Sequence, residues 1–417
     1  MVSSARVLVA TVWILWGGAG SMPALAGAPT PVGDELRVNG VTDGRQLRSA
    51  AAALGNGEVV VVWEGEDSDG RGVFGRRVDT LAQPLGSEIQ VSVGATGDQV
   101  SAEVAPTGDG GFLVVWESDA PGATEIRSRY FDASATPGPE VVVAPSQAGI
   151  DVSTPAVDRM ADGTFVVIWD EYDSPENDGS VRARFLTPAG SVAGSSFTLP
   201  TDGTSSNVFG PELGSRRGDG FLVAWEYVDS PDGLWAQSFT GAAAADGVPL
   251  EVTPGGSGYP RLAGLDGDGF MVVWASSTSV AKRRSFDAAG TGAPEVDIDP
   301  AAGSQRWLDV AAVPGGGAAV IWTTSPSSGP TRIDAQRIGA DSQVESEWRV
   351  DESSTSLFSS RILYDAASGH LVATWTRRSS VPIEQEDIYL RRYDLGTAIF
   401  LDGFESGGTT AWSSVFP

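Results

Sequence analysis

One short pattern recurs seven times along the chain: a run of apolar residues that follows a glycine-containing turn and ends in tryptophan. The runs read VVVVW, FLVVW, FVVIW, FLVAW, FMVVW, AAVIW and LVATW, and they end at Trp63, Trp116, Trp169, Trp225, Trp274, Trp322 and Trp375. Successive tryptophans lie 53, 53, 56, 49, 48 and 53 residues apart. Such a period is typical of a unit of four short strands, so the chain is predicted to contain seven of these units.

Each period also contains the other strands of a sheet. Between Asp98 and Asp151 the chain reads QVSAEVAP, FLVVWES, EIRSRYFD and EVVVA, segments separated by clusters of Gly, Pro, Asp and Ser. The tryptophan segment is apolar on both faces, which predicts a strand covered on both sides. Sheets stacked radially around an axis cover one another in this way. The sequence therefore predicts an all-β fold, a seven-bladed β-propeller of four-stranded antiparallel blades with buried tryptophans.

The two ends of the predicted ring are complementary. ELRVN, from Glu35 to Asn39, matches the last segment of the other repeats, whereas the seventh repeat lacks such a segment. We expect this N-terminal strand to complete the last blade, because ring closure removes free sheet edges.

A basic or amide residue recurs in the third segment of each repeat. In two repeats it is Arg129 or Arg284, and the turn that opens the neighbouring segment contains Asp109 or Asp268. We expect Arg129–Asp109 and Arg284–Asp268 ion pairs, each contributing at most about 1 kcal/mol because they would be exposed.

The regions outside the repeats predict export. Residues 1–26 carry Arg6, an apolar stretch from Val7 to Trp16 and a small-residue site, the features of a signal peptide cleaved near Ala26. The apolar stretch is too short to span a membrane. Residues 27–34 are expected to be a linker, 35–395 the propeller, and 396–417 a C-terminal tail. The protein is thus predicted to be secreted or held on the outer cell surface.

Composition limits the partners. The chain has 27 basic and 54 acidic residues, a formal net charge of -27, and no cysteine. Such a charge repels nucleic acid, so a protein or a glycan is the expected partner of a monomeric chain. Without disulfides, the core and the closed topology must hold the fold.

Charged residues share one position in the innermost strands. Glu103, Glu212, Arg261 and Asp309 each lie thirteen residues before the next tryptophan, and Arg361 lies fourteen residues before Trp375. Apolar or small neighbours flank them, a pattern typical of a strand with one wet face, which in a propeller borders the central channel. One hypothesis is a funnel site in which the arginines hold an acidic or hydroxylated ligand while a carboxylate acts as base. The alternative is mutual pairing of the charges in a solvated funnel.

An acidic loop and the single histidine are further candidates for a metal or catalytic site. Asp67 and Asp69, in an acidic loop after the first tryptophan, are candidate calcium ligands, but no loop has the complete calcium-binding spacing, and solvated turns are the alternative. No other cofactor is expected. His370 is the only histidine, which excludes a histidine metal cluster and leaves a serine triad without support.

These motifs resemble a known family. The DGGFLVVW stretch from Asp109 to Trp116 and its equivalents are similar to the D-G-G-F-V-V-V-W repeats of seven-bladed β-propellers in exported bacterial proteins. The resemblance covers Glu35 to Asp394. The tail, with DGFESG at residues 402–407, resembles a short signature at the ends of exported bacterial proteins and implies sorting or surface retention; a terminus without a role is the alternative.

Because proteins of one fold can have unrelated activities, the function must be inferred from the residues of the site. The scarcity of catalytic side chains favours a binding or interaction module, with an acidic loop face and a central funnel, over an enzyme. The first alternative is a carbohydrate-active enzyme, a hydrolase or lyase that uses the funnel carboxylates. The second is a structural repeat protein without a small ligand.

Overall fold

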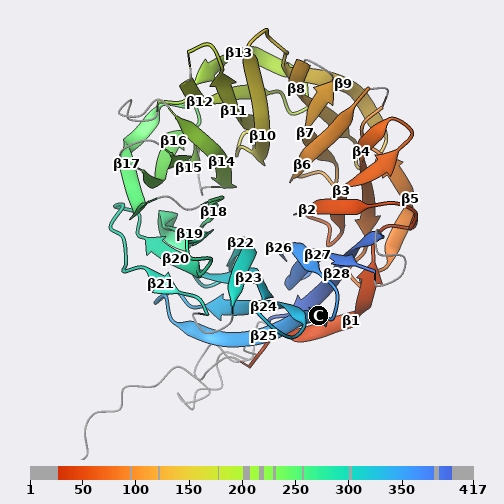
Figure 1. The fold of residues 1–417 in the computed structure, drawn as a ribbon, viewed down its shortest axis with the longest axis vertical. Helices are drawn as coiled ribbons and strands as arrows, with labels where there is room; N and C mark the ends of the chain where they lie inside the picture. Colours follow the sequence, from red (N-terminus) through yellow and green to blue (C-terminus); the bar gives the residue numbers. More distant parts are fainter. Residues whose placement is uncertain are drawn as a thin grey trace, which may run out of the picture.

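Seven sheets surround a central channel in the computed structural model (Figure 1). The structure describes residues 27–93, 96–120, 123–176, 178–200, 207–215, 220–228, 232–255, 258–299, 303–379 and 385–396. The predicted signal peptide and nearly all of the predicted tail lie outside these residues. Each sheet has four antiparallel strands, so the predicted seven-bladed architecture is confirmed.

The blades follow one another along the chain, and each runs from the channel outward. Blade 1 contains β2 (Gln46–Ala53), β3 (Val59–Asp67), β4 (Gly70–Val78) and β5 (Pro84–Gln90). Blade 2 contains β6 (Asp98–Pro106), β7 (Phe112–Ala120), β8 (Ala123–Phe131) and β9 (Pro137–Ala144). Blade 3 contains β10 (Ile150–Arg159), β11 (Phe165–Asp173), β12 (Asp178–Leu186) and β13 (Val192–Thr198). Blade 4 contains β14 (Val208–Ser215), β15 (Gly220–Tyr227), β16 (Gly233–Thr240) and β17 (Ala245–Pro254).

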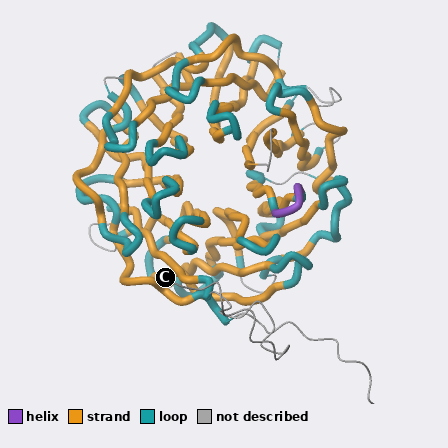
Figure 2. The backbone as a smooth tube through the Cα atoms, turned by 180° about the vertical axis from the view of Figure 1, so that it is seen from behind, coloured by secondary structure: helices purple, strands orange, loops and turns teal. Residues whose placement is uncertain are grey.

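The remaining blades complete the ring. Blade 5 contains β18 (Arg261–Gly264), β19 (Phe270–Ala275), β20 (Ala281–Phe286) and β21 (Val296–Asp297). Blade 6 contains β22 (Ser304–Val313), β23 (Gly317–Ser325), β24 (Thr331–Ile338) and β25 (Val344–Ser353). Blade 7 contains β26 (Leu357–Asp365), β27 (His370–Arg378), β28 (Glu386–Asp394) and β1 (Thr30–Arg37). Figure 2 shows the one helical turn of the described residues, η1 (Asp266–Asp268), between β18 and β19. No helix in the described ranges has the length and apolar character of a membrane span.

The core lies between the blades. All seven repeat tryptophans are at most 1% exposed, as expected. Between blades 1 and 2, Val60 and Val62 of β3 pack in one cluster with Val114 and Trp116 of β7. Burying a tryptophan removes about 150–250 Å² from water, so every blade contributes a large apolar surface to its neighbour. Each second strand is apolar on both faces because it has a blade on either side.

The N-terminal strand closes the ring. β1 pairs antiparallel with β28, from Thr30 opposite Asp394 to Arg37 opposite Tyr389. Beyond the strand, the Asn39 side chain accepts the Ile388 N–H at 2.8 Å. The predicted strand exchange is therefore confirmed. The strand begins at Thr30 rather than Glu35, so part of the predicted linker pairs in the sheet.

The third-strand arginines bridge blades instead of pairing with turn aspartates. Arg129 donates to the Gly138 carbonyl at 2.8 Å in its own outer strand and to the Val91 carbonyl at 2.9 Å in the preceding blade. Arg284 repeats this with the carbonyls of Ala293 at 2.9 Å and Val252 at 2.7 Å. The prediction of pairs with Asp109 and Asp268 was wrong. The long guanidinium side chain reaches carbonyls of both blades and so joins them at their boundary.

Candidate functional site in the central channel

A bulge marks the beginning of every innermost strand. At one residue per blade the backbone turns left-handed, with φ between 46° and 58°: Arg48, Ser101, Thr154, Gly210, Tyr259, Trp307 and Ser359. In six blades the pairing with the second strand shifts register at this point. A bulge re-aims the side chains next to it. All seven bulge residues line the mouth of the channel.

The charged positions found in the sequence lie two residues after the bulges. Glu103, Glu212, Arg261, Asp309 and Arg361 all line the channel. Arg361 follows the bulge residue Ser359 just as Glu103 follows Ser101, so the extra residue before Trp375 lies in the turn. The structure thus brings all five predicted site residues together; their role in binding a ligand stays a prediction.

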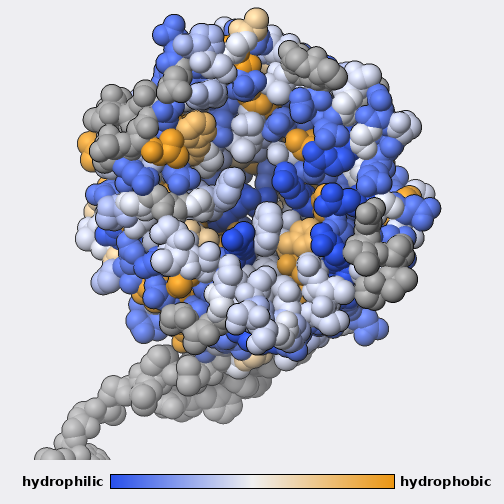
Figure 3. Space-filling model, in the orientation of Figure 1, coloured by the Kyte–Doolittle hydropathy of each residue, from blue (hydrophilic) through white to orange (hydrophobic). Residues whose placement is uncertain are grey.

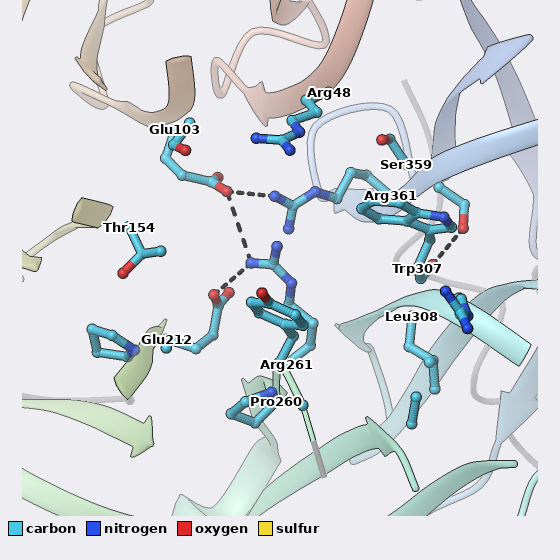
Figure 4. A pocket seen from close by; sticks show the side chains of 18 of the residues that line it. Arg48, Glu103, Thr154, Glu212, Pro260, Arg261, Trp307, Leu308, Ser359 and Arg361 are labelled. Carbon is cyan, nitrogen blue, oxygen red and sulfur yellow. Dashed lines mark hydrogen bonds and ion pairs between the residues drawn. The ribbon is translucent and has the colours of Figure 1, made fainter. Parts of the chain in front are cut away.

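Two arginines and two glutamates form one connected ionic network (Figure 4). The guanidinium of Arg261 donates to Glu212, and its Nη1 lies 3.8 Å from Glu103 Oε1. Arg361 donates to the same Glu103 oxygen. The side chains of Glu212 and Arg361 are each 20% exposed, so solvent reaches the network from the channel.

Burial dominates the protonation of this network. It raises the pKa of the Glu212 carboxyl; the Arg261 charge opposes this rise, and the Glu103 charge adds to it. Burial likewise raises the pKa of Asp309, against the charges of Arg361 and Arg261. For Arg261, burial lowers the guanidinium pKa, but the surrounding carboxylates outweigh it and raise that pKa overall. Two carboxyl groups in the channel therefore hold a proton more readily than a solvated carboxyl does.

The mouth of the channel is a cavity of about 550 Å³, and further residues that the sequence pattern did not indicate line it beside the charged ones. Arg48 and Arg306 add two positive charges, and Tyr259 and Trp307 present aromatic rings that are 78% and 45% exposed. Figure 3 shows hydrophilic side chains gathered around this central hollow. Aligning the repeats two residues further back would have found Arg48, Tyr259 and Trp307, but only a structure shows that this position is a bulge.

Buried acids hold the bulges in place. Glu64, which follows Trp63, is fully buried and accepts the N–H of the bulge residue Ser101 at 2.8 Å. Asp170, which follows Trp169, accepts the N–H of Gly210 at 3.1 Å. In the same position Glu117 accepts the backbone N–H of Thr154. Burial raises the pKa of Glu117 and that of Asp170 to about 7. These acids therefore support the channel and are not part of an exposed acidic face.

The candidate calcium ligands lie in the turn between β3 and β4. Asp67 Oδ1 accepts the N–H of Asp69 at 2.9 Å, a local contact that shapes the turn. Among the described residues, no three His, Cys, Asp or Glu side chains converge as a metal-binding group. Calcium binding stays a prediction for this loop.

Comparison with known proteins yields similarity of fold but not of sequence. No family model and no curated protein matches the chain. Similar solved structures include polysaccharide lyase Uly1, 13% identical with a TM-score of 0.57 over 83% of this chain and 90% of that chain. A PL25 ulvan lyase bound to -[GlcA(1-4)Rha3S]- is 10% identical with a TM-score of 0.57, covering 87% of this chain and 94% of that chain. The GH93 α-L-arabinofuranosidase of Fusarium graminearum is 11% identical with a TM-score of 0.50, covering 88% and 97%. This chain is a seven-bladed β-propeller.

The comparison corrects the functional interpretation. The preference for a binding or interaction module was wrong, because solved structures similar to this propeller are named as polysaccharide lyases and as a GH93 arabinofuranosidase, which favours the carbohydrate-active alternative. That preference depended on the scarcity of histidine and cysteine. The channel nevertheless brings three carboxyl groups and two arginines together, and burial raises the pKa of Glu212 and of Asp309 there.

Proposed function

We propose that the protein is a carbohydrate-active enzyme that breaks glycosidic bonds inside the channel. The observation that carries this proposal is Glu212: a buried carboxyl of raised pKa, open to a cavity of about 550 Å³ and next to Glu103 and Arg261. Paired titratable groups with different environments are the usual basis for general acid and base roles. The similar propellers named as polysaccharide lyases and arabinofuranosidase support this class of substrate.

We assign complementary roles to the two glutamates. Breaking a glycosidic bond requires a proton on the departing oxygen, whether the reaction is hydrolysis or elimination. Glu212 supplies that proton, since its raised pKa keeps it protonated to higher pH. Glu103, contacted by Arg361 and Arg261, is the carboxylate that takes up the proton of water in hydrolysis. In elimination it would instead take the proton from a ring carbon of the sugar.

The place of action is inferred from the sequence. The predicted leader at residues 1–26 and the resemblance of the repeats and tail to exported bacterial proteins support action outside the cell. Polymers too large to enter a cell are cleaved there. We therefore propose a secreted or surface-held enzyme acting on a polysaccharide.

Purified protein tested against a polysaccharide panel would check this proposal. New reducing ends measure cleavage, and ultraviolet absorbance of an unsaturated product separates elimination from hydrolysis. We expect Glu212→Gln to lose about 10²–10⁴-fold in rate, the contribution of a general acid. The matched control is Glu345→Gln, which removes a carboxylate 2.8 Å from Arg337 on an outer strand, far from the channel. Full activity of Glu212→Gln, or no cleavage of any panel member, would contradict the proposal.

A further inference from the structure

The charges of the channel are arranged in two tiers. The inner tier consists of the five residues of the ionic network and its neighbour: Glu103, Glu212, Arg261, Asp309 and Arg361. The outer tier, at the mouth, consists of Arg48, Tyr259, Arg306 and Trp307. In the inner tier three carboxyl groups face two guanidiniums, so its positive charge is already neutralised. The outer tier contains no carboxylate.

The two cations of the outer tier are paired weakly or not at all. Arg306 is exposed and makes no ion pair with any residue that the structure describes. The side chain of Arg48 is 53% exposed, and its nearest carboxylate, Glu64, is 3.7 Å away and also bound by Arg71 at 2.8 Å. In a chain of net charge -27, two such guanidiniums at one opening form a local positive site. Arginine in this state binds carboxylate or sulfate oxygens through charge-assisted hydrogen bonds.

The bulge residues make the mouth asymmetric. On blades 2, 3 and 4 they are small, Ser101, Thr154 and Gly210, whereas on blades 5 and 6 they are the aromatic Tyr259 and Trp307. In Figure 4, Thr154 and Trp307 lie on opposite sides of the two inner arginines. Exposed aromatic rings normally find a partner surface, and a flat sugar face fits a ring that projects into a cavity. The small side leaves room for the rest of a chain.

We propose that the outer tier is a subsite for an anionic sugar, whose ring stacks on Trp307 and Tyr259 and whose carboxylate or sulfate group is bound by Arg306 and Arg48. The inference rests on the proposed function, since it names the substrate class of the same channel. It gives a role to two exposed arginines that lie next to the proposed catalytic carboxylates, of which Arg306 has no ion pair among the described residues and Arg48 has only a partner shared with Arg71. The subsite holds the chain so that its next linkage lies over Glu212 and Glu103.

Calorimetric binding experiments in a Glu212→Gln background, which prevents turnover, test this subsite. The probes are oligogalacturonate for carboxylate, dextran sulfate oligosaccharides for sulfate, and neutral dextran oligosaccharides of equal length. We expect one anionic series to bind at least about tenfold more tightly than the neutral one, with the preference falling as salt is added. Which of the two series binds identifies the anionic group.

Added variants assign the effect to residues. Arg306→Gln and Trp307→Ala should each weaken binding of the anionic probe by about tenfold, the effect of one charge-assisted contact or one lost stacking surface. Trp307→Phe should retain most of the affinity, and only Arg306→Gln should reduce its salt dependence. Arg37→Gln, at an exposed arginine of the outer strand β1, is the control and should change nothing.

The outcomes separate this inference from the proposed function. Equal affinity for neutral and anionic probes, no binding of any probe, or indifference to both variants would overturn the anionic subsite. Binding that depends on Arg306 and Trp307 without cleavage by the unmodified protein would support the subsite and contradict the enzyme. Cleavage of a neutral polysaccharide at a rate that Arg306→Gln does not change would support the enzyme and contradict the anionic subsite.

Discussion

The second strand and the innermost strand of each blade come from the same repeat, but the first keeps its key residue in every blade and the other does not. The apolar run of the second strand ends in tryptophan in all seven blades, and every one of these tryptophans is at most 1% exposed. The residue two positions after the bulge of the innermost strand varies instead: Ala50, Glu103, Ala156, Glu212, Arg261, Asp309 and Arg361. The tryptophan position lies between two similar blades and must satisfy the same packing requirement in every repeat. A position that faces the channel is free to vary, so a nearly symmetric scaffold carries an asymmetric site.

The largest expected effect lies in the contact that holds the ring together. Removing residues 27–40 should lower the free energy of unfolding by more than the roughly 3–5 kcal/mol of a buried tryptophan, because it opens the whole ring at β28. Chemical denaturation measures this loss. A synthetic peptide of residues 27–40 added to the shortened protein should restore part of it. An unchanged denaturation midpoint would show that the blades do not need closure.

Two variants of blade 4 separate the two strands directly. Trp225→Ala in β15 should lower the free energy of unfolding by about 3–5 kcal/mol, since it leaves a cavity between blades. Glu212→Gln in β14 should change that free energy by less than about 1 kcal/mol, because the amide still accepts a hydrogen bond from Arg261. Its loss should appear in the rate of glycosidic cleavage. Comparable destabilisation by both variants would mean that the channel residues are structural.

The difference between these strands also explains what the sequence could predict. The tryptophan period reflects burial, which recurs in every blade, so the number of blades followed from it. Ring closure followed from a separate signal, the match between Glu35–Asn39 and the last segment of the other repeats. Four of the charged positions were found because they lie thirteen residues before a tryptophan, and the fifth, Arg361, lies one residue further away. Their pairing could not be predicted, since contacts such as Arg361 with Glu103 cross the channel between residues 258 positions apart.

The bulges of the innermost strands and the partners of the third-strand arginines could not be predicted from this sequence. A left-handed backbone position is usually marked by glycine in a sequence, but Ser101 and Trp307 occupy such positions without being glycine. The residues that line the mouth were therefore missed. The third-strand arginines were assigned to nearby aspartates, whereas Arg129 reaches carbonyls of its own outer strand and of the preceding blade. Both depend on how two blades sit against each other. That relation is set by packing and not by local sequence.

The acids that support the bulges predict a pH-dependent stability. Burial raises the pKa of Glu117 from 4.5 to about 7, so the unfolded chain gives up this proton more easily than the folded one. The free energy of unfolding should therefore fall as pH rises from about 4.5 to about 7. Glu117→Gln should flatten this slope in melting temperatures measured across that range. Asp132, an exposed aspartate whose pKa is lowered by the Thr136 and Ser134 N–H groups, is the matched contrast: Asp132→Asn should lower the melting temperature equally from about pH 4.5 to about pH 7, leaving that slope unchanged, and its effect should disappear as pH falls below about 4. A slope unchanged in Glu117→Gln would contradict the assignment.

The smallest expected effect concerns the bulge itself. Blade 4 has Gly210 at the left-handed position, whereas blade 7 has Ser359, with a φ of 54° and a buried hydroxyl that has no hydrogen-bond partner in the structure. Ser359→Gly should therefore raise the free energy of unfolding by about 1 kcal/mol, since it removes backbone strain and an unpaired polar group and loses some of this gain to chain entropy. Ser360→Gly next to it should destabilise the protein, because the Ser360 hydroxyl donates to the Trp307 carbonyl at 2.5 Å. Destabilisation by both variants would show that the Ser359 side chain is needed at the channel mouth, as the aromatic bulge residues of blades 5 and 6 are proposed to be.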